Sequence, residues 1–325
     1  MSITIPPARI RIALCLLFLL SVRLLLADTT QANNLLQQGR VDEALASLHD
    51  VLAAQPGDAQ AHLILCRVYY SQNIADNAIH ECELAVSGAP SSSDSQMWLG
   101  RAYGFKASRA NPLAALSLAI KVRTAFERAV ELDPENIHAM SDLGEFYVAA
   151  PALIGGGLDK AQALARKMQP RFAGQAHRLL ALIAEKKKDL STAESEFVNA
   201  AATGKTPEAY VDLGFFYQRH NQPDKMLSAL ETAVNIDRRK GPAIVDAASI
   251  LIGAHRSPEL AETLLRTYLS SSDKTDAAPA FKVHVQLGEL LSQHGDSAGA
   301  HREYAAALAL APNYAPARKA MRQGS

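Results

Sequence analysis

Residues 281–314 read FKVHVQLGELLSQHGDSAGAHREYAAALALAPNY. Apolar residues recur at intervals of three or four in both halves, which predicts two short antiparallel helices. Small residues such as Gly288 and Ala300 allow the two helices to approach closely, and large ones such as Tyr304 fill the space between them. Pro312 ends the second helix, because proline has no backbone N–H to continue it. One such pair cannot bury its own apolar face, so similar pairs are expected upstream.

This stretch resembles the tetratricopeptide repeat, whose pattern is W-x2-L-G-x2-Y, then A-x3-F, then P. The residues at the corresponding positions are His284, Leu287, Gly288, Leu291, Ala300, Tyr304, Ala307 and Pro312. Upstream, Gly100, Gly144, Gly214 and Gly288 occupy the same position at intervals that fit one expanded unit and two pairs of ordinary units. The resemblance implies an all-α, right-handed α-solenoid of about eight helix-turn-helix units over residues 28–314, with the first helices lining a concave surface.

Two units are longer than the pattern. The third has about ten extra residues around 107–122, which we expect to be additional helical turns capped by Asn111 with Pro112 in the first position. The fourth contains the insertion APALIGGG at 150–157. Its glycines suggest a turn between helices, because no strand precedes them and no Lys-Ser/Thr pair follows as a phosphate loop requires. Residues 315–325 are expected to form a capping helix and tail.

The first 27 residues differ from the rest. Arg9 and Arg11 precede an apolar run over residues 12–22, and Ala27 precedes a polar stretch, as in a secretory signal. This predicts an exported protein of the bacterial periplasm or envelope. Arg23 and Leu25 fit a signal less well, so the alternative is an uncleaved anchor in the inner membrane formed by residues 10–27.

The charge balance disfavours nucleic acid as a partner. Lys+Arg and Asp+Glu both number 33, and the first 27 residues contain three of the arginines, so the remainder is mildly acidic. No HExxH, GxSxG or CxxC motif is present, and no serine is tied by sequence to a histidine and a carboxylate. We therefore expect no enzymatic activity, no cofactor and no metal site. Contact with a membrane is expected only through an uncleaved N-terminal segment.

The concave surface is the default binding site of the family. Positions that line it carry Arg67, Tyr70, Arg101 and Phe105 in the second and third units, a combination that suits an acidic peptide segment. The alternative is a solvated face whose arginines pair with neighbouring carboxylates. The corresponding positions of the fourth and sixth units add four groove residues: Glu145, Phe215, Gln218 and Arg219.

Cys66 and Cys82 occupy positions that face each other in the family's packing. In an oxidising compartment they could form a disulfide, and the alternative is two small buried hydrophobes. A zinc site that adds His62 and His80 is disfavoured, because residues two apart on a helix point in different directions.

These features predict a scaffold that binds a peptide or helical segment of a partner protein in an open groove. The alternative function is a periplasmic small-molecule-binding component of a solute-handling system. That alternative predicts a closed apolar cavity near residues 113–122.

Overall fold

The computed structural model describes residues 29–323. The predictions for residues 1–27, a signal or an anchor, and for the last two residues of the tail lie outside this range. The described residues are helical, without a strand, and residues 29–37 form the first helix. The other helices are α2 (Val41–Ala54), α3 (Ala59–Ser71), α4 (Ala75–Gly88), α5 (Ser93–Ala107), α6 (Pro112–Leu132), α7 (Ile137–Ala149), the 3₁₀ helix η1 (Ala152–Ile154), α8 (Leu158–Met168), α9 (Ala173–Lys186), α10 (Leu190–Gly204), α11 (Pro207–Arg219), α12 (Pro223–Ile236), α13 (Pro242–Gly253), α14 (Pro258–Ser270), α15 (Ala280–Gln293), α16 (Ser297–Leu310) and α17 (Ala315–Gln323).

Consecutive helices form eight pairs within the described range, followed by α17, and the fold is an all-α solenoid. The expansion of the third unit is helical, as predicted, because α6 runs for 21 residues. The Asn111 side chain accepts a hydrogen bond from the Ala114 amide at 3.0 Å, and Pro112 occupies the first turn. The expansion of the fourth unit contains η1 and the turn before α8.

The close contact inside each pair explains why glycine recurs. A Cβ atom placed on Gly288 would lie 2.4 Å from a ring carbon of Tyr304, and one on Gly100 would lie 2.4 Å from the Phe126 ring. Both distances are far below van der Waals contact, so any side chain would force the two helices apart. Glycine at this position therefore sets the distance between the helices of a pair.

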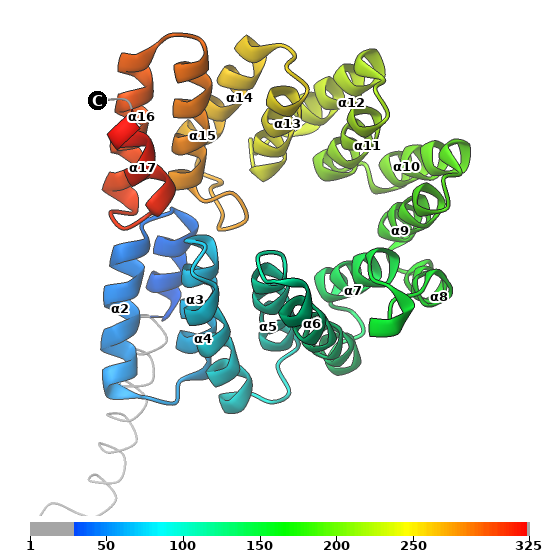
Figure 1. The fold of residues 1–325 in the computed structure, drawn as a ribbon, viewed down its shortest axis with the longest axis horizontal. Coiled ribbons are helices and arrows are strands. Elements are labelled where there is room, and N and C mark those ends of the chain that lie inside the picture. Colours follow the sequence, from blue (N-terminus) through cyan, green and yellow to red (C-terminus); the bar gives the residue numbers. More distant parts are fainter. Residues whose placement is uncertain (1–28, 324–325) are drawn as a thin grey trace, which may run out of the picture.

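The solenoid curves until its two ends meet, so the helix pairs form a closed ring (Figure 1). The turn at Gly39, where φ is +78°, lies against α15: a Cβ on Gly39 would be 3.1 Å from the Ala280 amide nitrogen. Residues of the first unit and of the last share one hydrophobic core. Within it the Phe281 ring packs edge-on against Tyr314, with centroids 4.8 Å apart. We call this junction of the two chain ends the seam.

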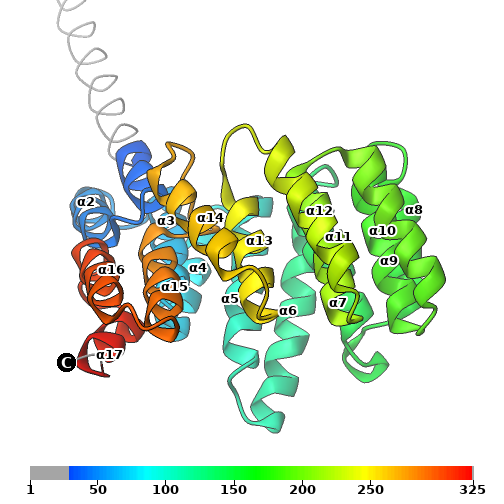
Figure 2. The same cartoon turned by 90° about the horizontal axis from the view of Figure 1, so that it is seen from above.

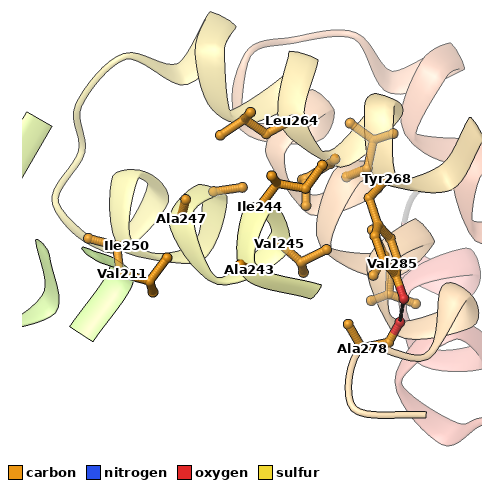
Figure 3. Close-up of a cluster of buried hydrophobic side chains, with 14 of the residues drawn as sticks. Val211, Ala243, Ile244, Val245, Ala247, Ile250, Leu264, Tyr268, Ala278 and Val285 are labelled. Carbon is orange, nitrogen blue, oxygen red and sulfur yellow. Dashed lines mark hydrogen bonds between the residues drawn. The ribbon is translucent and has the colours of Figure 1, made fainter. Parts of the chain in front are cut away.

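Polar contacts also cross the seam. Arg67 on α3 donates to Asp276 at 2.9 Å and to the Asn33 side chain at 2.9 Å. Asp276 lies in the loop 271–279, which Tyr268 of α14 holds in place (Figure 3). The Tyr268 hydroxyl donates to the Ala278 carbonyl at 2.7 Å and accepts from the Thr275 amide at 3.0 Å. The loop that closes the ring is thus anchored in the buried core of the seventh pair.

The α5–α6 pair projects beyond its neighbours (Figure 2). Its apolar residues at helical spacing are exposed: Leu113 is 81% accessible, Leu116 40% and Ile120 43%. The closed apolar cavity expected near residues 113–122 by the small-molecule alternative is therefore wrong, because no other element of the described chain covers this face of α6. Within residues 29–323, no helix combines the length and apolarity needed to cross a membrane.

Candidate functional site

The first helices of the pairs face the centre of the ring, and the second helices lie on its outside (Figure 1). We call the surface formed by α3, α5, α7, α9, α11, α13 and α15 the inner surface. Side chains that project from it come from equivalent positions of successive pairs. They can therefore bond to one another around the ring.

One group of inner side chains surrounds Trp98 on α5. The Tyr70 ring lies 5.5 Å from the Trp98 ring, edge-on, and 5.5 Å from the Phe105 ring. The guanidinium carbons of Arg67 and Arg101 lie 5.5 and 4.8 Å from the centre of the Trp98 ring. The four residues predicted as a basic and aromatic patch are thus brought together, and we call the group the arginine–aromatic cluster.

The arginines of this cluster also have carboxylate partners. Arg101 donates to Asp142 on the next pair at 2.6 Å, and Arg67 bonds Asp276 across the seam. Burial raises the pKa of Asp142, and the Arg101 guanidinium opposes that shift. The alternative prediction of arginines paired with neighbouring carboxylates therefore describes these contacts, although the partners differ from those expected from the sequence. Arg67 and Arg101 consequently position the aromatic rings and also join helix pairs.

A hollow of about 340 Å³ opens on the inner surface between α7, α9 and α11. Its apolar wall includes Val148, Leu182 and Phe215, and 46% of Phe215 is exposed. The Arg219 guanidinium lies over the Phe215 ring, with its carbon 4.3 Å from the ring centre. We call this hollow the Phe215 pocket. An exposed aromatic ring in a concave site offers area for a partner's apolar side chain.

Arginine–carboxylate bonds fix the rim of the Phe215 pocket. Arg178 on α9 bonds both Glu145 on α7 and Asp212 on α11, each at 2.7 Å. Burial alone would lower the pKa of Arg178, but the two carboxylates raise it. Arg219 on α11 bonds both oxygens of Glu185 on α9, at 2.9 and 2.7 Å. These bonds tie three successive pairs together, so the pocket has a preformed shape.

A group of carboxylates lies beside the Phe215 pocket: Asp246 on α13, with Asp212 and Glu208 on α11. Burial, together with the neighbouring carboxylates of Asp212 and Glu208, raises the pKa of Asp246 to about 6. No cation bonds Asp246 within the part of the chain that the structure describes. The inner surface is therefore more acidic at α11 and α13 than at α3 and α5.

The structure separates one predicted groove residue from the others. Gln218 does not line the Phe215 pocket; its side chain donates to the Ile250 carbonyl on α13 at 3.1 Å. In contrast, Trp98 is not among the predicted groove residues, and it forms the centre of the arginine–aromatic cluster. The signal that identifies it is its spacing, because Trp98, Arg101 and Phe105 share one helix face at i, i+3 and i+7.

Cys66 and Cys82 are joined in a disulfide, with Cα atoms 5.2 Å apart. Both residues are fully buried between α3 and α4. His62, which the zinc alternative would use, contacts Glu81 at 2.6 Å and the Pro56 carbonyl at 3.0 Å. In residues 29–323 no three His, Cys, Asp or Glu side chains are grouped as a metal site requires.

The glycine-rich insertion acts as a turn that packs on its neighbours. Gly155 has φ +91°, and a Cβ there would overlap the Arg123 side chain. Arg123 donates to the Ile154 carbonyl at 3.2 Å, and Lys160 donates to the Gly155 carbonyl at 2.9 Å. Because Arg123 on α6 and Lys160 on α8 both donate to carbonyl oxygens of the turn, the turn links these two helices.

Comparison with known proteins agrees with this repeat architecture. Residues 29–93, which span the first two helix pairs, match the family model "Tetratricopeptide repeat". The later pairs repeat the same arrangement of helices. Residues 29–93 therefore resemble tetratricopeptide repeats, and the described chain as a whole has the fold of a tetratricopeptide-type α-solenoid. No curated protein sequence matched it.

Several solved structures resemble the fold. Yeast Tom70 superposes with a TM-score of 0.51 at 16% identity, over 87% of this chain and 58% of Tom70. A thermophilic TPR protein from Thermus thermophilus gives 0.48 at 20% identity, over 70% of this chain and 99% of that one. A tetratricopeptide repeat protein from Parabacteroides merdae gives 0.44 at 12% identity, over 92% and 98%. The chain thus spans less than two thirds of Tom70, and the likeness to Tom70 is one of fold.

Proposed function

We propose that this protein is a scaffold without enzymatic activity that binds a peptide or helical segment of a partner protein on its inner surface. Tetratricopeptide repeat proteins generally mediate protein–protein interactions. The observation that carries the proposal is the Phe215 pocket, where an aromatic ring is 46% exposed inside a frame of paired charges. A rigid frame lowers the entropy lost on binding, and a half-exposed aromatic residue in a concave site is the usual centre of a binding surface.

The proposed location is the periplasm or the cell envelope of a bacterium. The disulfide between Cys66 and Cys82 supports export, because disulfides persist in oxidising compartments and are rare in the cytosol. Both residues lie in the core of the second pair, so the bond contributes to stability only where it can form. Thiol labelling of the protein denatured straight from cells tests this location, since export predicts that both thiols are blocked.

The experiment that tests the scaffold function is capture of a partner from an envelope extract, with residues 28–325 as bait. The variant Phe215→Ala removes the exposed ring of the pocket. The matched control is Leu113→Ala, which removes an even more exposed apolar side chain from the projecting α6 helix. Circular dichroism shows that each variant keeps the native helix content before capture is compared. Arg67→Ala is unsuitable as a test, because it would also break the seam.

We expect the native chain and Leu113→Ala to capture the same partner, and Phe215→Ala to lose most of it. Truncating a central aromatic residue of an interface typically costs about 2 kcal/mol or more, which is about thirtyfold in affinity. Equal capture by Phe215→Ala would place the binding surface elsewhere. Loss of capture with Leu113→Ala alone would assign binding to the outer face of α6.

Small-molecule binding remains a second candidate function because the Phe215 pocket, at about 340 Å³, lies within the size range of ligand sites. Its rim offers few unpaired polar groups, since Arg178 and Arg219 already bond carboxylates. A screen of small molecules by thermal shift tests this candidate. A ligand that raises the melting temperature of the native chain, and not that of Phe215→Ala, would favour it over the scaffold.

A further inference from the structure

The first part of α6 forms the end of the projecting α5–α6 pair (Figure 2). None of residues 112–121 is buried, and Val122 is the first residue of the helix that is. At about 1.5 Å per residue, this exposed part of α6 spans about 15 Å. We call residues 108–121, which comprise it and the turn before it, the α6 tip. A helix that water surrounds is normally polar on every side, so the composition of the α6 tip is informative.

The exposed part of α6 is apolar instead. Residues 112–121 read PLAALSLAIK and carry a single charge, that of Lys121. Leu113, Leu116 and Ile120 are exposed, Leu113 by 81%. Successive residues of a helix are about 100° apart, so these three lie within an arc of about 60°. Leu118, on the opposite side of the helix, packs against the neighbouring core. The exposed side chains therefore form one apolar stripe about 10 Å long.

Positive charge accompanies this stripe. Residues 95–126 contain five arginines and lysines and no aspartate or glutamate. Two of these cations belong to the α6 tip, Arg109 in the turn and Lys121 at the other end. Both are exposed, and each lies over an aromatic ring of the same helix pair. Neither has a carboxylate within 4 Å among the described residues, whereas Lys106 and Arg123 pair with carboxylates of α4 and α6.

The end of the helix adds to this positive character. The N-terminal end of α6 lies in the α6 tip, and the N-terminal end of a helix dipole is positive. The first turn of α6 contains no acidic residue that would offset it. The balanced overall charge of the chain gave no sign of this local excess, because acidic residues elsewhere compensate for it. The α6 tip thus combines an exposed apolar stripe with unpaired positive charge.

We propose that the α6 tip attaches this protein to the surface of an anionic lipid bilayer. Leu113, Leu116 and Ile120 enter the boundary between headgroups and acyl chains, and Arg109 and Lys121 contact the lipid phosphates. The stripe is about as long as the 5–10 Å to which such helices are buried in a bilayer. Attraction to anionic headgroups supplements the burial of apolar surface. The contact is peripheral, and it goes beyond the scaffold function without depending on it.

A second copy of the chain is a less suitable occupant of the stripe. A stable protein interface takes about 20–30 residues from each partner, whereas the stripe provides three side chains at the end of a projecting helix pair. A bilayer needs no complementary surface, and its attraction for a helix grows with the apolar area buried and with the positive charge beside it. The local excess of cations therefore favours anionic lipid.

The test places the environment-sensitive fluorophore NBD on Leu113→Cys in the full chain. Cys15→Ser removes the third cysteine of the sequence, since Cys66 and Cys82 are bonded to each other. The labelled chain is mixed with vesicles of phosphatidylglycerol and phosphatidylcholine, and separately with vesicles of phosphatidylcholine alone. The matched control carries the label on Leu84→Cys, because Leu84 is another exposed leucine, on α4. A label at a defined position reports on the α6 tip whatever residues 1–27 do.

We expect anionic vesicles to raise the emission at position 113 and shift it to shorter wavelength, and a lipid-borne quencher to reduce it. The label at position 84 should not respond. Adding Ile120→Asn should lower the ratio of inserted to free label about tenfold or more, because the variant loses the burial of an isoleucine side chain. Arg109→Gln and Lys121→Gln should each lower that ratio about fivefold at low salt. The charge-matched control Lys167→Gln, at an exposed position in the last turn of α8, should leave it unchanged.

The proposal is overturned if the label at position 113 does not respond to anionic vesicles, even where the full chain binds them through another segment. An equal response to vesicles of phosphatidylcholine alone would also overturn it, because the cations would then have no role. A response without vesicles that grows with protein concentration would assign the stripe to contact between copies of the chain. The vesicle test involves no partner protein, so its failure leaves the scaffold function standing, and a failed capture leaves this membrane contact standing.

Discussion

The ion pair that closes the ring provides a quantitative prediction. The side chains of Arg67 and Asp276 are only 16% and 12% exposed, and they join segments from opposite ends of the chain. Breaking a well-buried pair by removing one partner costs about 3–5 kcal/mol, and an exposed pair contributes about 0–1 kcal/mol. For this mostly buried pair we expect Asp276→Asn to lower the free energy of unfolding by about 2–3 kcal/mol.

Arg67→Met should cost more than Asp276→Asn, because Arg67 also loses its bond to Asn33 and its contact with Trp98. In a double-mutant cycle followed by urea unfolding, we expect a coupling energy of about 1–3 kcal/mol between the two sites. In both single variants, amide hydrogen exchange should become faster over residues 29–40 and over residues 271–283, since the seam holds both segments.

The matched control is the pair Arg128–Glu131 on the outer helix α6, whose side chains are 46% and 70% exposed. Its coupling energy should be about 0.5 kcal/mol or less, because water screens both charges. The reasoning is refuted if the coupling between Arg67 and Asp276 is as small as that of the control. It is equally refuted if hydrogen exchange changes at only one of the two chain ends.

Three further predictions concern stability. Burial holds the pKa of Asp246 near 6, above its ordinary value, so the folded chain loses stability as the pH rises from about 4 to 7. Asp246→Asn should remove that loss: the variant should be more stable than the native chain at pH 8 and about equally stable at pH 4. Urea unfolding measures both free energies, and a difference between variant and native chain that does not change with pH would contradict the raised pKa. Gly288→Val should cost about 1–3 kcal/mol or more, because a Cβ would lie 2.4 Å from the Tyr304 ring, and an unchanged melting temperature would show that the pair can open freely. Replacing Cys66 and Cys82 by alanine should lower the free energy of unfolding by about 3 kcal/mol, because the disulfide closes a loop of 16 residues. Reducing the disulfide in the native chain should cause the same loss of stability if the bond is its source.

Local features of the fold follow from the sequence because they depend on neighbouring residues. The glycine at the close-contact position, the Asn111 cap and the length of α6 were each predictable, since spacing and capping chemistry act within one or two turns. The eight helix pairs follow from repetition of the same spacing. These features needed no knowledge of how distant units meet.

Ring closure was not predictable in this way. It depends on the sum of small rotations between successive pairs, including two expanded ones, and no single residue encodes that sum. Arg67 and Asp276, which are 209 positions apart, give no local signal that they bond. The same reason explains why Lys282 and Asn73, whose side chains hydrogen-bond across the seam, were not identified as neighbours from the sequence, although the cluster around Trp98, built from adjacent units, was largely predictable.

The seam is the central feature of the fold, because it joins the two chain ends and thereby defines the inner surface. The most direct test is a disulfide trap with Gly39→Cys and Ala280→Cys. A Cβ on Gly39 would lie 3.3 Å from the Ala280 Cβ, close to the separation in disulfides, and the single variant Gly39→Cys reports the strain of a side chain at φ +78°. After mild oxidation and peptide mapping, we predict an intramolecular bond between these positions in the monomer. A double variant that forms only intermolecular bonds, or none, while each single variant folds normally, would contradict a closed ring.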